Sequence, residues 1–172
     1  MNILSLDVGE YCGWAILIYG QIESGTEHLK HKGTEYRGFK YLRFTELINR
    51  LYRIGAFNLI VYEKPHGLRG HAIEAMNGYI TRIHEFAVVK GLELSISNQI
   101  EYKGYSPSTI KKFATGNGRA SKEDMIAYFK EQTGNDPVDD KEADSYSLLR
   151  YAMQERGIPC RDMVHLTKRG MK

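Results

Sequence analysis

The stretch "NILSLDVGEYCGWAILIYGQIESGTEHL", residues 2–29, decides the fold. It contains a short apolar run that ends at the acid Asp7, followed by two further apolar runs joined at residues 19–21. Short apolar runs bounded by glycine and polar residues are typical of β-strands, and a two- or three-residue connection is typical of a hairpin. The pattern of residues 2–29 therefore predicts three consecutive antiparallel strands at the start of the chain.

The remaining chain alternates between helical and strand patterns. We expect strands over residues 57–65 and 92–97, and helices over residues 36–54, 71–89, 106–114, 121–132 and 139–156. Strands that alternate with helices are joined by crossover connections and lie parallel in one sheet. The sequence therefore predicts an α/β fold in which a mixed five-stranded sheet, three antiparallel strands followed by parallel strands, is flanked by helices.

Two helices carry more detailed signals. In residues 36–54 an amphipathic pattern places five apolar side chains near one face, namely Phe39, Leu42, Leu47, Leu51 and Ile54. In residues 121–132, Ser121 precedes the helix and Asp124 follows three residues later, which is close to a capping box.

The bulk composition is that of one globular domain. The 172 residues are 42% hydrophobic and 26% charged, so we expect one domain over residues 1–160 and a basic tail over residues 161–172. No apolar run reaches the ~18 residues of a membrane-spanning helix, and the N-terminus has no secretory pattern. Cys12 and Cys160 lie far apart in no metal-binding spacing, so we expect free thiols in a reducing cytoplasm.

Charge is unevenly distributed along the chain. Residues 28–53 carry seven bases and two acids, and residues 99–122 carry five bases and one acid. Residues 123–144 reverse the balance, with eight acids and two bases. Basic surfaces around an acidic focus suit a polyanion held over a metal site, although ordinary solvated helix faces give the same pattern.

Two acids end apolar strands. Asp7 closes the first strand and Glu63 closes the strand that stops at Pro65. A carboxylate in such a place must lie at the edge of the sheet or be buried with a partner. If the two strands are neighbours, the two acids meet. A turn residue or a partner for a helix dipole is the alternative for each acid taken alone.

The stretch "DDKEADSYSLLRYA", residues 139–152, begins a helix with acids and then turns apolar. Asp140 and Asp144 are four residues apart and therefore lie on one helical face. The helix dipole favours acids in the first turn, which explains Asp139 and Asp140 but leaves the deeper Asp144 unexplained. The small residue Ala143 would let this helix approach the sheet closely.

Convergence of these acids would need a cation. Four carboxylates without bases strongly resist ionising together, and Mg²⁺ prefers oxygen ligands while it keeps several waters. Two such ions about 3.5–4 Å apart can activate a water and stabilise the leaving oxygen of a phosphodiester. The pattern predicts a metal-dependent phosphodiesterase site built from Asp7, Glu63, Asp140 and Asp144.

Four segments together resemble one known family. "LSLDVGEYCGWAI" (residues 4–16) resembles the first strand motif of the RNase H-like nucleases, and of the RuvC Holliday junction resolvases in particular. "IVYEKP" (60–65) is similar to their second acidic motif. "SPSTIKKFATGNGRASKEDMI" (106–126) is similar to the RuvC segment from a basic helix to a lysine-bearing helix, and "EADSYSLLRYA" (142–152) is similar to the closing helix. The compact form looks most like phage or prophage RuvC-like resolvases.

The resemblance implies a homodimeric endonuclease that uses two Mg²⁺ ions per site, or Mn²⁺ instead. Such an enzyme resolves four-way (Holliday) DNA junctions by paired symmetric nicks, hydrolysing phosphodiesters with a metal-activated water to leave a 5′-phosphate and a 3′-hydroxyl. It would act in the cytoplasm, or in the host cytoplasm if a phage encodes it. The resemblance assigns Asp7, Glu63 and Asp144 as metal ligands.

The fourth acid departs from the family pattern. RuvC proteins place an acid three residues before the final aspartate, and this position is Lys141 here. Asp140 faces the same way as Asp144, so we assign it as the fourth ligand, with Glu142 as the alternative.

Basic residues complete the site that the resemblance implies. Lys111 and Lys122 match the functional lysines of the family, and we expect Lys122 to bind the scissile phosphate or steady the attacking water. His66 stands where RuvC proteins place an aromatic wedge. The expected DNA-binding set is Lys111, Lys112, Arg119, Lys122, His66 and Arg69, and solvated surface residues are the alternative for each.

Other functions remain open from the sequence. The same acids would serve a structure-selective nuclease for flaps, forks or other branched DNA, or an RNase H that acts on hybrids. A non-catalytic junction-binding protein would not need the acid set. An actin-like ATPase or sugar kinase needs two domains, for which 172 residues are too few. The apolar positions of residues 71–89 form either a core face alone or a core face and a dimer interface.

Overall fold

The first three strands form the meander that the sequence predicts. The protein is described by a computed structural model in which residues 1–94, 99–159 and 164–166 are placed. Strand β1 pairs antiparallel with β2, and β2 pairs antiparallel with β3. The strands are β1 Ile3–Asp7, β2 Tyr11–Ile18, β3 Gln21–His28, β4 Leu59–Glu63, β5 Glu101–Tyr105 and β6 Val164–Leu166.

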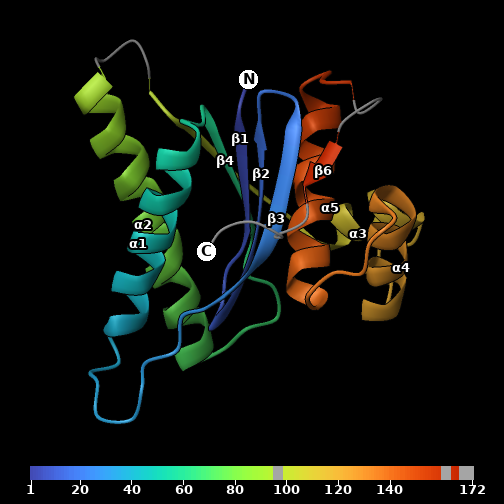
Figure 1. Ribbon diagram of the computed structural model, residues 1–172. Helices are drawn as coiled ribbons and strands as arrows, with labels where there is room; N and C mark the ends of the chain where they lie inside the picture. Colours follow the sequence, from blue (N-terminus) through green and yellow to red (C-terminus); the bar gives the residue numbers. More distant parts are fainter. Residues whose placement is uncertain (95–98, 160–163, 167–172) are drawn as a thin grey trace.

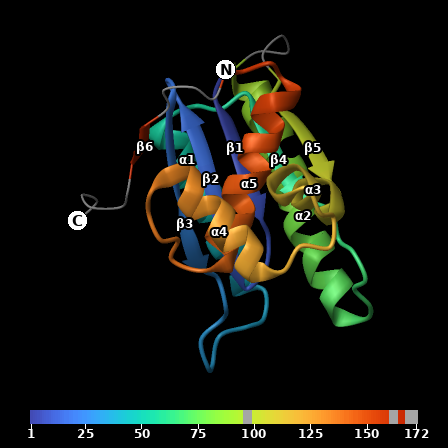
Figure 2. The ribbon, with the colours of Figure 1, turned by 90° about the vertical axis from the view of Figure 1, so that its right-hand side faces the viewer.

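The sheet is mixed and is covered by helices on both faces. Its described strands have the order β5-β4-β1-β2-β3-β6, with β4 parallel to β1 and β5 parallel to β4. The helices are α1 Phe39–Ile54, α2 His71–Leu94, α3 Pro107–Thr115, α4 Lys122–Thr133 and α5 Asp140–Glu155. Helices α1 and α2 cover one face, while α3, α4 and α5 lie on the other (Figures 1 and 2).

The predicted α/β class is therefore confirmed, with one strand more than expected. The sixth strand, β6, pairs parallel with β3 at the edge of the sheet. It lies within residues 161–172, the segment expected to be a basic tail.

The prediction for the fifth strand was wrong in its position. Residues 92–94 are the last residues of α2, and residues 95–97 lie outside the described part of the chain. Strand β5 instead begins at Glu101, and three of its five residues are exposed. An exposed edge strand has no apolar run or clear alternation, so periodicity could not detect it.

The apolar face predicted for α1 was partly wrong. Phe39, Leu42 and Ile54 are 38%, 56% and 38% exposed. The residues that this helix buries are Phe44, Leu47, Ile48 and Leu51. These positions follow the i, i+3, i+4, i+7 spacing of one helical face, and the predicted set spread over a wider arc.

The sheet is apolar on both faces, so it separates two cores. In β1, Leu4 and Leu6 pack with residues of α1 and α2, and Ile3 packs with residues of α4 and α5. Alternate residues of a strand point to opposite faces, so Ser5 and Asp7 share the α5 side with Ile3. This alternation decides which helix each site residue faces.

Helix α5 lies unusually close to the sheet, as expected from Ala143. A Cβ built on Gly13 of β2 would lie 1.9 Å from the carbonyl oxygen of Lys141. Ser5 Oγ donates a 2.7 Å hydrogen bond to the carbonyl oxygen of Ser145. Gly13 and Ser5 therefore bring the backbone of α5 against the centre of the sheet.

Helix α4, which begins with Lys122, and helix α5, which carries Asp140 and Asp144, both have side-chain caps. The side chain of Asp139 accepts a hydrogen bond from the Glu142 amide at the start of α5. Ser121 and Asp124 form the capping box predicted for α4. Within the described residues, no helix is long and apolar enough to cross a membrane.

Candidate active site

Two acids lie side by side at the end of the sheet. Strand β1 is parallel to β4 with Leu6 opposite Tyr62, so Asp7 and Glu63 are the next residues of neighbouring strands. The expectation that these strands are neighbours is confirmed. Both acids point toward α5, because Asp7 shares a face with Ser5, which contacts that helix, and Glu63 shares a face with Val61, which packs with residues of α5.

Helix α5 adds a third acid to the pair. Burial is the largest cause that raises the pKa of Asp144 to about 7, and the charge of Asp7 is the second largest. Burial raises the pKa of Glu63 to about 8, with further contributions from Asp7 and Asp144. The pKa of the buried Asp7 is also above its usual range because of burial. The structure thus brings Asp7, Glu63 and Asp144 into one low-dielectric site, where burial disfavours the charge of each acid and neighbouring acids add to this effect.

Lys141 is a site residue whose role the sequence reasoning missed. Its Nζ lies 3.0 Å from Asp7 Oδ2. Burial alone would lower the pKa of Lys141, but the charges of Asp7, Asp144 and Asp140 outweigh burial and raise it. The signal for this role in the sequence is a single lysine among four acids, at the position where RuvC proteins place an acid.

Asp140 lies on the outer side of the cluster. Its Oδ2 is 2.6 Å from Lys122 Nζ, and this contact holds the pKa of Asp140 below its usual value. Asp140 also contributes to the raised pKa of Asp7 and of Asp144, so it lies within electrostatic range of both.

Glu142 has a different environment. Its buried carboxylate accepts 2.6 Å hydrogen bonds from Ser24 Oγ and from the Val138 amide. These contacts tie the first turn of α5 to β3. Between the two candidates for the fourth ligand, the geometry favours Asp140, since the Glu142 oxygens are already engaged elsewhere.

The acids of this site have the oxygen ligands that a hard cation prefers. Among the described residues, no three His, Cys, Asp or Glu side chains lie close enough, as placed, to enclose a metal ion. The available donors are carboxylate oxygens, which Mg²⁺ prefers. Beyond the larger effect of burial, neighbouring acids raise the pKa values of Glu63 and Asp144, and Lys141 offsets this only in part. A divalent cation would relieve this repulsion.

Two predicted lysines lie near the acids. Lys111 of α3 donates a 2.8 Å hydrogen bond to the Ala120 carbonyl, and its charge lowers the pKa of both Glu63 and Asp144. Lys122 begins α4 and contacts Asp140. Helices α3 and α4 therefore place one lysine each beside the cluster.

The structure does not join the other predicted DNA-binding residues to the acids. Lys112 and Arg119 are exposed on and after α3, and Lys112 lines a shallow pocket with Phe113 and Tyr151. His66 and Arg69 are exposed between β4 and α2. No hydrogen bond or ion pair in the described part of the chain links these four side chains to the acid cluster.

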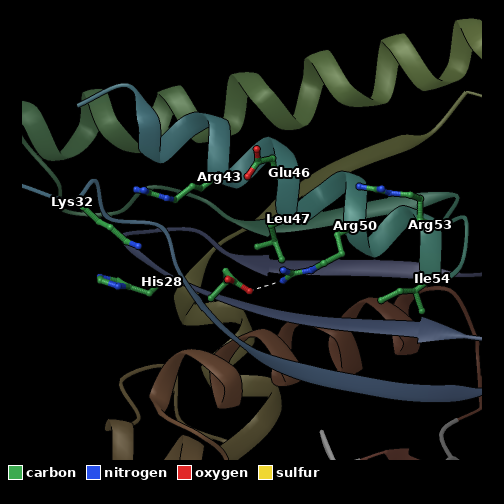
Figure 3. A pocket seen from close by; sticks show the side chains of 9 residues that line it. His28, Lys32, Arg43, Glu46, Leu47, Arg50, Arg53 and Ile54 are labelled. Atoms are coloured by element: carbon green, nitrogen blue, oxygen red, sulfur yellow. Dashed lines mark hydrogen bonds and ion pairs between the residues drawn. The ribbon is translucent and has the colours of Figure 1, made fainter. Parts of the chain in front are cut away.

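Four of the seven basic residues in the segment 28–53 line a separate groove, namely Lys32, Arg43, Arg50 and Arg53. This groove measures about 820 Å³ and runs along α1 beside β3, on the face of the sheet opposite α5 (Figure 3). Arg50 contacts Glu27 at 2.5 Å, and Arg43 contacts Glu35 at 2.6 Å. Acids pair with part of this basic charge, and the groove does not include the carboxylate cluster.

Comparison with solved structures identifies the architecture. No protein-family model and no curated protein matches the sequence. RuvC of T. thermophilus in complex with a Holliday junction substrate superposes with a TM-score of 0.70 at 17% identity, covering 92% of this chain and 97% of that one. The chain has the RuvC fold. The RNase H-like class expected from the sequence is thereby confirmed.

Two further structures agree. A second structure of Thermus thermophilus RuvC gives a TM-score of 0.67 at 17% identity, covering 91% of this chain and 96% of that one. The yeast mitochondrial Holliday junction resolvase Ydc2 gives 0.60 at 13% identity, covering 91% and 79%. Within this RuvC fold, Asp7 and Glu63 end neighbouring central strands and α5 lies across them.

Proposed function

We propose that this protein is a metal-dependent endonuclease that resolves four-way DNA junctions by paired symmetric nicks. The observation that carries the proposal is the convergence of Asp7, Glu63 and Asp144, from three elements, in one site with raised pKa values. The RuvC fold supports the choice of substrate, because one solved protein with that fold is in complex with a Holliday junction.

Asp7, Glu63, Asp144 and, as the fourth ligand, Asp140 would hold two Mg²⁺ ions, with Mn²⁺ as a substitute. When bound, divalent ions polarise an attacking water and stabilise the leaving oxygen of a phosphodiester. The carboxylates supply hard oxygen ligands and the negative charge that concentrates such ions. Helix α5 fixes two of the four acids relative to the sheet.

The lysines would hold the DNA backbone. Lys122 forms an ion pair with Asp140, but its side chain is 69% exposed. It can therefore also turn toward a phosphate of the DNA backbone. Lys111 lies near Glu63 and Asp144, where its charge favours a bound phosphate beside them. Lys141 favours the charged form of Asp7 and holds this side chain in place through their ion pair.

Paired nicks require two sites, so we propose a homodimer. The second half of α2 supports an interface, because Val88, Val89 and Leu92 are exposed there while Ile83, Phe86 and Ala87 are buried against the sheet. Exposed apolar side chains gathered on one helix are typical of an interaction surface.

The proposal is tested by Asp7→Asn. The variant should bind a four-way junction as the wild type does and should lose at least about a hundredfold in nicking rate, since it removes an anionic donor from the reacting site. Binding is measured by gel shift in chelator, and nicking with Mg²⁺. The matched control is Asp136→Asn, which changes an exposed aspartate paired with Lys130. An Asp7→Asn protein that folds and still nicks normally would contradict the proposal.

A further inference from the structure

A second pocket lies at the same end of the sheet as the acids. It measures about 550 Å³ and is formed by the turn after β1, the start of α1 and the first half of α2. We call it the α1–α2 pocket. Its size falls within the range of small-molecule sites. Val8 and Gly9, which follow Asp7 directly, form part of its wall.

The floor of the α1–α2 pocket is apolar but contains unsatisfied polar atoms. Val8 and Tyr79 are almost completely buried, and Met76 is half-buried beside them. The Tyr79 hydroxyl and His31 Nδ1 are buried without a hydrogen-bond partner among the described residues. Buried polar atoms normally have partners, so the Tyr79 hydroxyl and His31 Nδ1 are available to bond a ligand that enters the pocket.

The rim of the α1–α2 pocket is mainly cationic. Arg37 and Lys40 line it together with His71, and Glu10 is the one acid among the lining residues. Lys40 Nζ lies 6.0 Å from the centre of the Tyr79 ring. An apolar floor with hydrogen-bonding atoms below a cationic rim matches a nucleobase that carries its phosphate outside.

The pocket and the acids are joined by one short stretch of chain. Asp7 faces α5, and Val8 faces α1 and α2, because successive residues of a strand point to opposite sides. Two residues of extended chain span about 7 Å. A DNA strand with a phosphate at Asp7 would therefore have to cross only this end of the sheet to place an adjoining nucleotide in the pocket.

We propose that the α1–α2 pocket receives one unstacked nucleotide next to the cut phosphate. The Tyr79 hydroxyl and His31 would bind the base, while Arg37 and Lys40 would bind its phosphate. This inference rests on the proposed function, since it assumes that branched DNA is the substrate. It adds a point of base readout that is distinct from the carboxylates.

Tyr79→Phe tests the proposal, because it removes only the hydroxyl. That hydroxyl has no described partner, so the variant should melt no lower than the wild type. Affinity for a four-way junction is measured by fluorescence anisotropy in chelator, where no cutting occurs. A second set of junctions carries one abasic nucleotide, moved stepwise through the positions that flank the crossover.

We expect Tyr79→Phe to weaken junction binding about threefold to tenfold. At one abasic position, and not at the others, wild type and variant should bind equally, since the base that Tyr79 contacts is missing. Tyr52→Phe, which alters a half-buried tyrosine outside the pocket, is the control and should show no loss.

Other outcomes separate the two proposals. If the wild type binds and nicks junctions but Tyr79→Phe has no effect on binding, the pocket proposal is wrong and the proposed function stands. The same conclusion follows if Tyr79→Phe weakens binding equally at every abasic position. A Tyr79→Phe protein that changes its oligomeric state would overturn it too and assign the pocket to a second copy of the chain. Failure of the wild type to bind any branched DNA would overturn the proposed function and the pocket together.

Discussion

At the scale of single residues, the carboxylate site contains an ion pair between Asp7 and Lys141. Asp7 is buried, and its Oδ2 forms an ion pair with Lys141 Nζ. A buried charge that loses its partner is strongly unfavourable. Lys141 thus performs, within the chain, part of the neutralisation that a divalent ion would perform.

Lys141→Met should lower the stability of the metal-free protein by about 1–3 kcal/mol, less than for a fully buried pair because Lys141 is partly exposed. Mg²⁺ should then stabilise the variant more than the wild type, since the ion takes over the neutralisation of Asp7. Urea unfolding with chelator and with Mg²⁺ measures both effects. Lys130→Met, which breaks an exposed pair, is the control. An identical loss in both conditions would show that Lys141 acts by packing alone.

Glu63 makes the metal-free protein sensitive to pH. Burial raises its pKa from the ordinary 4.5 to about 8. The folded state therefore binds this proton more tightly than the unfolded state, so the stabilisation is complete below pH 4.5 and is lost as the pH rises through 8.

Between pH 5 and pH 8 we expect the chelated wild type to lose about 2–4 kcal/mol relative to Glu63→Gln, which has no proton to lose. Urea unfolding at the two pH values measures the difference, and Glu131→Gln, an exposed residue, serves as control. Parallel pH profiles for wild type and Glu63→Gln would mean that Glu63 is not in a charge-poor site.

At the scale of elements, the contact between α5 and β2 positions the site. Gly13 leaves no room for a side chain against the backbone of α5. Because that helix carries Asp140 and Asp144, any displacement moves two of the four acids.

Gly13→Ala should therefore destabilise the protein by at least about 2 kcal/mol and reduce nicking, since backbone atoms must shift to admit the methyl group. Thermal melting and the nicking rate are measured on the same preparation. Gly38→Ala is the matched control, because a Cβ there meets nothing within 4 Å and its φ of −68° suits alanine. Wild-type stability of Gly13→Ala would contradict the close approach.

The elements also show where sequence patterns succeed. Strands β1 and β4 are buried on both faces, so they read as apolar runs, and the acids at their ends were predicted to be adjacent. Strand β5 lies at an edge with exposed side chains, so its position was missed. For α1, an apolar face was recognised, but Phe44 and Ile48, which follow the helical spacing and are buried, were missing from the predicted face.

At the scale of the whole molecule, the site depends on residues that are far apart in the chain. Asp7, Glu63 and Asp144 come from two strands and one helix that meet at one end of the sheet. Their convergence could be predicted because Asp7 and Glu63 end strands with a clear pattern and Asp144 lies near the start of a helix with a clear pattern. The contact of Lys141 with Asp7 and the α1–α2 pocket depend on side-chain directions in the folded chain, so they could not.

The RuvC fold places these features in a consistent arrangement. The carboxylates lie on the α5 side of the sheet, the α1–α2 pocket lies on the other side of the same end, and the exposed apolar residues of α2 lie further along that helix. A junction held by two copies of the chain would bring its strands to the two carboxylate clusters.

The most direct test of the central claim is a cleavage assay on a mobile four-way junction, beside a flap, a fork and plain duplex, with Mg²⁺ and with chelator. We predict paired symmetric nicks in the junction that chelator abolishes, with 5′-phosphate and 3′-hydroxyl ends. Equal or faster cutting of flaps and forks would contradict junction resolution and assign the same carboxylate site to general processing of branched DNA.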